Sequence, residues 1–153
     1  MFRNLLSRLF SDDPQPQPLA SVDAEVAIAA LLVRVARADD HYSPTEQSRI
    51  DRILARRRGL DDKEAAARRA AAEMIEAEAP DTVRFTRVVK DRVALDDRLG
   101  VIGAMWEVAY ADAQRNPEEE SLIRLVAGLL GVNDRDSAVA RQQVLAQMGL
   151  PEV

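Results

Sequence analysis

The sequence predicts an all-α protein, a compact bundle of about seven helices with an internal duplication. Apolar residues recur at intervals of three and four along most of the chain, and no segment shows the alternation typical of a strand. The sequence also repeats itself: ARADDHYSPTEQSRIDRIL at residues 36–54 returns as AYADAQRNPEEESLIRLVA at residues 109–127. We therefore expect two halves, at about 19–90 and 93–150, related by a pseudo-twofold axis.

Residues 1–18 are expected to precede this bundle as an amphipathic segment and a proline-rich linker. The apolar side chains of residues 2–10 fall on one helical stripe, opposite two arginines. The linker, SDDPQPQP, carries three prolines that hold it extended. We expect residues 2–10 to dock on their own domain or on a second copy in a homodimer; the alternative is weak contact with a membrane surface.

The helices of the first half are expected within the domain that spans residues 19–153. The longest apolar run, residues 26–33, predicts a buried central helix. It is far shorter than the roughly 20 residues that span a bilayer, so a transmembrane helix is not expected there. A second helix is ended by Gly59, which can take the left-handed conformation of a helix stop. A third is capped by Asp61 or Asp62 and runs to about Ala79.

A short helix follows, and three more helices are expected in the second half. The first of these carries Leu95, Trp106 and Tyr110 on its inward face, so both aromatic rings should pack in the core. The next helix is ended by Gly131, and the last begins at about Asp134.

Composition and charge exclude several functions. A formal net charge of −5 argues against nucleic acid as a partner and favours a cation or a basic protein. Without cysteine the chain has no disulfide, thiolate metal site or redox thiol. The sequence shows no signal peptide or membrane span, so a cytoplasmic location is expected.

The two connectors between paired helices carry the informative chemistry. Ser43 precedes a proline and is followed three residues later by Glu46, which predicts a capping box. Asn116 and Glu119 repeat this arrangement in the second half. Both glutamates are therefore expected to bond back to the amide of their cap residue.

Asp39 and Asp112 need another explanation, because each should lie at the C-terminal end of a helix, where the macrodipole disfavours an anion. Each carboxylate can accept hydrogen bonds from loop amides. Alternatively, each can bind a hard divalent ion such as Ca²⁺ or Mg²⁺, with Asp39 and Glu46 at one site and Asp112 and Glu119 at a second.

A motif present in both halves, A-x-A-D-G followed seven residues after the aspartate by glutamate, resembles the tellurite-resistance TerB-like family. It reads ARADD with Glu46 and AYADA with Glu119. The relatives of this family include the N-terminal helical domain of DjlA-type membrane co-chaperones. The resemblance extends from about Leu19 to Met148, and it implies an all-helical intracellular module that is linked to tellurite and metal stress and has no established enzyme activity.

The resemblance also implies metal binding by the acidic residues, but the sequence departs from the motif at both glycines. Asp40 replaces one glycine and adds a carboxylate to the first connector. Ala113 replaces the other, and because alanine disfavours a positive φ, we expect the second connector to adopt a different conformation. If only one of the two sites binds a metal ion, we expect it to be the one in the first connector. The candidate metal ligands are Asp39, Asp40, Glu46, Asp112 and Glu119.

Other candidate residues have simpler explanations. His41 is the single histidine, so transition-metal binding is disfavoured and an exposed loop position is expected. The arginines at 56–58, with Arg68 and Arg69, can attract an oxyanion, although arginines on outer helix faces are usually solvated. The chain lacks the motifs of nucleophilic and zinc enzymes, and it lacks the His-Pro-Asp tripeptide of a J-domain.

Two functions therefore remain from the sequence. One is a non-enzymatic, metal-responsive stress module whose acidic connectors bind a divalent cation. The other is a helical adaptor or co-chaperone-type accessory domain, which binds a protein partner and uses its acidic residues only as helix caps.

Overall fold

The computed structural model describes residues 21–79 and 81–151, and this part of the chain forms seven helices and no strand. The expected all-α fold is confirmed. The helices are α2 (Ser21–Arg37), α3 (Pro44–Arg58), α4 (Asp62–Glu78), α5 (Val83–Arg92), α6 (Leu95–Ala109), α7 (Pro117–Leu129) and α8 (Asp134–Gln147). Residues 2–10 and the linker lie outside the described residues.

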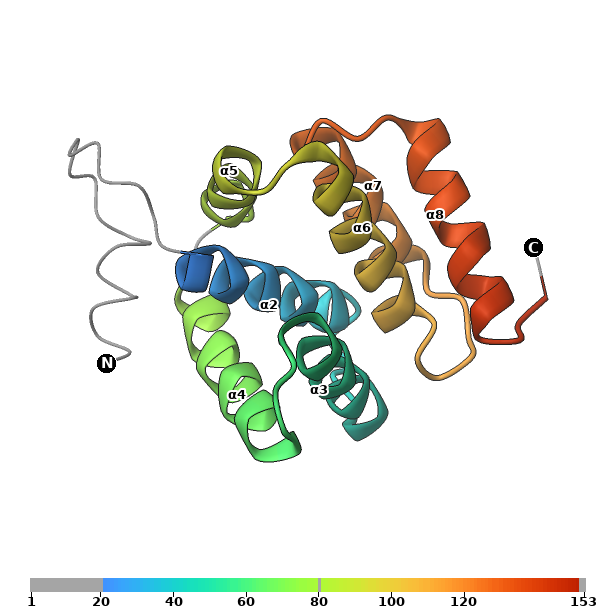
Figure 1. Cartoon of the computed structure of the whole chain (residues 1–153). Helices are drawn as coiled ribbons and strands as arrows, with labels where there is room; N and C mark the ends of the chain where they lie inside the picture. The colour runs from blue at the N-terminus through green and yellow to red at the C-terminus, as the bar shows by residue number, and fades with distance from the viewer. Residues whose placement is uncertain (1–20, 80, 152–153) are drawn as a thin grey trace.

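Helix α2 is the central element of the bundle. It packs against α3, α4, α5, α6 and α7 (Figure 1). Every side chain from Ala24 to Ala36 is buried except Arg34, which is half-buried. The apolar run therefore forms the buried axis that the sequence predicts.

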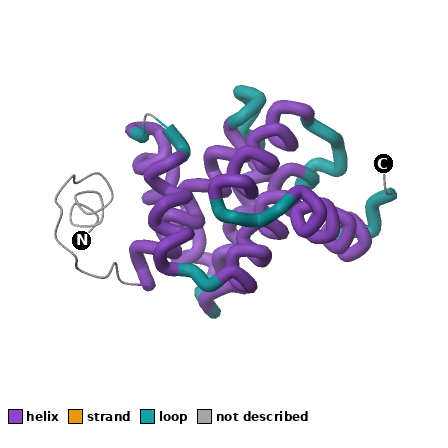
Figure 2. The backbone as a smooth tube through the Cα atoms, turned by 90° about the horizontal axis from the view of Figure 1, so that it is seen from above, coloured by secondary structure: helices purple, strands orange, loops and turns teal. Residues whose placement is uncertain are grey.

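The remaining helices form two groups, one around α2 and one around α6. Helices α3, α4 and α5 lie on the α2 side, while α6 packs against both α7 and α8 (Figure 1). Figure 2 shows the bundle from above, with its helices joined by loops. Helix α6 also contacts α2 and α3, which joins the two groups into one core. The pseudo-twofold relation between the halves remains a prediction.

Local sequence signals set the helix ends. Ser43 and Asp61 both make complete capping boxes, with Glu46 and Glu64 as their partners. Gly59 ends α3 with φ 64°, a left-handed conformation that glycine adopts without steric cost. These ends agree with the sequence analysis.

The C-terminal end of α4 is instead satisfied by side chains of α2. Arg34 donates to the carbonyl of Ala79 at 2.9 Å, and Arg37 donates to the carbonyl of Glu73 at 3.2 Å. The last turn of α4 has no basic residue of its own, so arginines of α2 supply the donors there. The carbonyl of Ala79 lies beyond the last turn and has no partner within the helix.

The expected inward face of α6 is wrong at its first residue. Leu95 is 49% exposed, because it lies in the first turn of α6, at the edge of the core. Trp106 and Tyr110 are buried as expected, with stacked rings whose centroids are 5.9 Å apart. Among the described helices, none is long and apolar enough to cross a membrane.

Because α2 is enclosed on most sides, truncation of its core residues should be costly. We expect Ile28→Ala, at a fully buried position, to lower the free energy of unfolding by about 2–5 kcal/mol. Leu125→Ala, at a position 57% exposed on α7, should change it by less than about 0.5 kcal/mol. Urea unfolding followed by circular dichroism measures both, and similar losses in the two variants would contradict a core centred on α2.

Candidate acidic site at the two connectors

The connectors after α2 and α6 have the same backbone conformation. Asp40 and Ala113 both have φ 63°, in the left-handed region. The amide of Asp40 donates to the carbonyl of Arg37 at 3.0 Å, and the amide of Ala113 donates to that of Tyr110 at 2.9 Å. The expectation that Ala113 would change the second connector is therefore wrong, because the hydrogen bonds of the loop hold alanine in a conformation it disfavours.

Both connector aspartates accept hydrogen bonds from loop amides. Asp39 Oδ1 accepts from the amide of His41 at 3.0 Å, and Asp112 Oδ1 accepts from the amide of Gln114 at 3.1 Å. Each aspartate thus stabilises its own turn, as short polar side chains commonly do. These bonds explain how a carboxylate is tolerated just beyond the C-terminal end of a helix.

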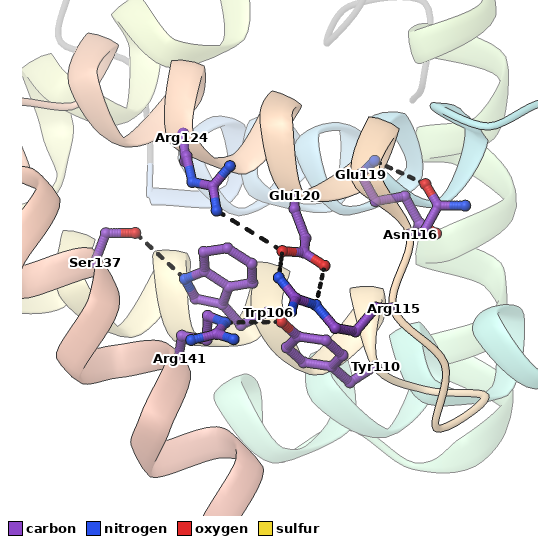
Figure 3. Close-up of polar contacts among 9 residues, drawn as sticks. All are labelled: Trp106, Tyr110, Arg115, Asn116, Glu119, Glu120, Arg124, Ser137 and Arg141. Atoms are coloured by element: carbon purple, nitrogen blue, oxygen red, sulfur yellow. Dashed lines mark hydrogen bonds and ion pairs between the residues drawn. The ribbon is translucent and has the colours of Figure 1, made fainter. Parts of the chain in front are cut away.

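A hydrogen bond joins the two connectors directly. Asn116 Nδ2 donates to Asp39 Oδ2 at 2.6 Å, while Asn116 Oδ1 accepts from the amide of Glu119 at 2.9 Å (Figure 3 shows the second bond). Asn116 therefore caps α7 and also binds the first connector. The sequence indicates only its capping role, because residues 77 positions apart carry no local signal of their contact.

Glu46 and Glu119 differ in how they cap. Glu46 Oε1 accepts from the amide of Ser43 at 2.9 Å, which completes its capping box. Glu119 does not bond back to the amide of Asn116, so the second capping box is incomplete and that expectation is wrong. Its Oε1 atom is buried and accepts no hydrogen bond. The Glu119 carboxyl lies instead against that of Glu46.

Two carboxyl groups can form a hydrogen bond only when one of them carries a proton. Burial is the largest cause that raises the pKa of Glu119, to about 9, followed by the charge of Glu46, the hydrogen bond with it, and the charges of Asp39 and Asp112. Burial also raises the pKa of Glu46, but the Ser43 amide and the Glu119 carboxyl both favour its charged form. The raised pKa of Glu119 favours its protonated form, which can donate a hydrogen bond to Glu46.

Asp39, Glu46 and Asp112 all lie near enough to Glu119 for their charges to raise its pKa, and we call these four acids the acidic centre. The sequence analysis assigned them to two separate sites. Each half of the repeat contributes one aspartate and one glutamate, so the centre requires both halves.

The two glutamates of the acidic centre are unusual among the buried acids of the described residues. The other buried glutamates, at 25, 76, 107 and 120, each form an ion pair with at least one arginine. Burial of a carboxylate is costly unless a cation compensates its charge. Glu46 and Glu119 interact with each other instead, and burial together with the Glu46 charge raises the pKa of Glu119.

The neighbouring polar residues of the first connector are exposed. His41 Nδ1 lies 2.9 Å from the carbonyl of Asp39, and this bond, together with the Asp39 charge, raises the pKa of His41. Asp40 is also exposed beside it. Within the described residues, no group of three or more histidine, aspartate or glutamate side chains is arranged to hold a metal ion.

The arginines that the sequence analysis considered for an oxyanion are largely used in ion pairs. Arg56 binds Glu107 at 2.8 Å, and Arg57 binds Glu25 at 3.2 Å. Arg69 binds both Asp51 and Glu73, at 2.6 and 3.0 Å. These carboxylates already neutralise the arginine charges to which an anion would bind.

A second polar network, beside the aromatic pair, was not expected from the sequence. Glu120 accepts two hydrogen bonds from Arg115, at 2.9 and 3.0 Å (Figure 3). Arg141 Nε donates to the Tyr110 hydroxyl at 2.8 Å. Arginines and acids alternate along α7 and α8, and this pattern could have indicated the network from the sequence. Such patterns are common on exposed helix faces, so they do not specify a buried network.

The fold and the acidic centre define an all-helical module in which two connectors each contribute one aspartate and one buried glutamate to a single acidic centre. The family model of the tellurite resistance protein TerB matches residues 25–142, more than three quarters of the chain. The chain belongs to the TerB family, which confirms the resemblance found in the sequence. It is therefore a TerB-like helical module linked to tellurite resistance. No curated protein and no solved structure shows a significant match to it.

The shared proton should make stability depend on pH through Glu119. Because folding raises its pKa from 4.5, its contribution is complete below about pH 4.5 and is lost as the pH rises toward about 9. Glu119→Gln keeps a neutral side chain that can donate a hydrogen bond, so we expect it to gain about 1–3 kcal/mol over the unchanged protein as the pH rises. Urea unfolding across this pH range measures the gain.

The matched control is Glu118→Gln at the exposed neighbouring position, which should show no such pH-dependent gain. Parallel pH profiles for Glu119→Gln and the unchanged protein would contradict the protonated pair.

The left-handed alanine supplies a separate prediction. Ala113→Gly should raise the free energy of unfolding by about 0.5–1 kcal/mol, because it relieves a steric cost of about 1–2 kcal/mol that exceeds the added entropy of the unfolded chain. Ala70→Gly, at an exposed helical position of α4, should lower it by about 0.5–1 kcal/mol. Opposite signs in denaturant unfolding are expected, and equal losses would show that the connector conformation is not strained.

Proposed function

We propose that this TerB module acts without catalysis, as a cation-responsive element of tellurite or metal stress in which a divalent ion binds at the acidic centre. The observation that supports this proposal is the buried Oε1 atom of Glu119, which has no hydrogen-bond partner inside a cluster of four acids. An unsatisfied buried oxygen is costly, and a cation would satisfy it.

The donor set suits a hard cation. All four acids supply oxygen ligands, which Ca²⁺ and Mg²⁺ prefer. Glu46 and Asp112 each use one carboxylate oxygen for a backbone amide. Asp39 uses one oxygen for the His41 amide and the other for Asn116, and its oxygens keep lone pairs for further ligation. Because no three of these groups are arranged for an ion, binding would require Glu119 to lose its proton and the side chains to shift.

Such binding would act on the junction of the two halves. The acidic centre combines the connector from α2 to α3 with that from α6 to α7, and Asn116 links them through Asp39. An ion that rearranges these side chains would therefore alter how the connectors are held. A change of this kind at a helix junction can be transmitted to a protein partner.

The alternative function, a helical adaptor, is supported by a different observation. Three of the four acids bond to backbone amides of their own connector, as caps and turn residues do. In that case the acidic centre only holds the connectors in place, and the module works through contact with a protein partner.

Titration with divalent ions separates the two functions. We expect Ca²⁺ or Mg²⁺, added to chelator-stripped protein, to give saturable NMR shifts of backbone amides in residues 38–43 and 110–116. Saturation at about 100 times the dissociation constant should stabilise the fold by about 2.7 kcal/mol. Asp112→Asn should weaken this response, while Glu118→Gln, at an exposed position outside the centre, should leave it unchanged. Unshifted amides at millimolar ion would exclude the cation site and leave the adaptor function.

A further inference from the structure

A groove between α6 and α8 is used by neither of the two functions above. Its volume is about 350 Å³, and apolar side chains, among them Leu99, Ala104, Val139 and Val144, form much of its lining. We propose that this groove, which we call the α6–α8 groove, binds the N-terminal segment, residues 2–10, of the same chain. The proposal does not depend on the acidic centre, which lies at the connectors.

The groove and the N-terminal segment agree in length. Helices α6 and α8 pack against each other (Figure 1), and the lining residues of α6 extend from Leu99 to Glu107. These positions are about 12 Å apart along the helix axis. The N-terminal segment would span about 14 Å as a helix. A helix of this length can therefore lie along the whole groove.

The apolar surfaces of the two partners are complementary. Val139 on the wall of the groove is 44% exposed, and Leu99 and Ala140 are only partly buried. The N-terminal segment carries its own apolar side chains on one helical stripe: Phe2, Leu5, Leu6, Leu9 and Phe10. Contact between this stripe and the groove would remove both apolar surfaces from water, which is favourable.

The described chain begins close enough to the groove for the N-terminal segment to reach it. Helix α2 begins at Ser21, and Glu25, one turn further, pairs with Arg57 at 3.2 Å. A Cβ atom at Gly100, which lines the groove, would lie 4.0 Å from Nη1 of the same arginine. Residues 11–20 can span about 31 Å when extended, which exceeds the length of one helical turn and one glutamate–arginine pair.

The charges of the two partners favour their contact. The N-terminal segment contains Arg3 and Arg8 and no acid, so its formal charge is +2; subtracting this from the net charge of −5 leaves −7 for the rest of the chain. Among the charged residues that line the groove, Arg56 is paired with Glu107 at 2.8 Å, and Asp136 is an exposed acid. The groove therefore presents no unpaired cation that would repel the segment.

The linker favours the segment of the same chain over that of a second copy. A short tether holds its two ends at an effective concentration on the order of millimolar. A segment from a second copy has no such advantage unless the protein itself is that concentrated. The same groove would then be covered within one molecule, without a dimer.

A spin label on the N-terminal segment tests this proposal, and the chain has no cysteine of its own that would also be labelled. With the label at Ser7→Cys, opposite the apolar stripe, we expect NMR signals of backbone amides in residues 99–107 and 136–147 to broaden. Val139→Glu places a charge on the apolar wall and should abolish this broadening. Leu125→Glu, at a 57% exposed position on α7 outside the groove, should leave it unchanged. Circular dichroism confirms that each variant is folded.

Three results would overturn this proposal. The first is broadening that is absent or evenly spread over the surface, which would leave the N-terminal segment free for another surface, such as a membrane. The second is unchanged broadening in folded Val139→Glu. The third comes from a mixture of isotope-labelled chains without the spin label and spin-labelled chains without the isotope. Broadening of the groove amides in that mixture would show that the segment of a second copy occupies the groove.

Discussion

The meeting point of the two connectors depends on two buried carboxyl groups, those of Glu46 and Glu119, whose burial and mutual charge raise the pKa of Glu119. Glu46 and Glu119 are almost fully buried, and two carboxylates in contact there would repel each other strongly. A proton on Glu119 converts that repulsion into a hydrogen bond. Together with the bond from Asn116 to Asp39, this pair holds the connectors of α2–α3 and α6–α7 against each other.

The contrast with the other buried acids shows why this place is the candidate site. Elsewhere in the described part of the chain, buried glutamates are compensated by arginine: Glu25 by Arg57, and Glu107 by Arg49 and Arg56. Those ion pairs are complete and are expected to be structural. At the acidic centre no arginine compensates Glu119, and its pKa is raised instead.

Membership of the TerB family connects this architecture with tellurite resistance. The acidic centre supplies carboxylate oxygens, the ligand type that hard cations prefer. Helix α7 begins at this centre, because its cap residue Asn116 also binds Asp39 of the first connector.

The sequence by itself determined the helices, their ends and the buried axis. Apolar periodicity, the Ser43 and Asp61 caps and Gly59 are local signals, so they specify local structure without knowledge of distant contacts. The repeated motif also identified all four acids of the acidic centre. Only the tertiary structure decided that these acids share one centre, that Glu119 faces Glu46 instead of its own cap, and that Ala113 keeps the left-handed conformation. The first two features depend on residues more than 70 positions apart, whose contact follows from how the helices pack and not from any pattern within a single helix. The conformation of Ala113 depends on the hydrogen bonds of its own loop, which outweigh the preference of alanine.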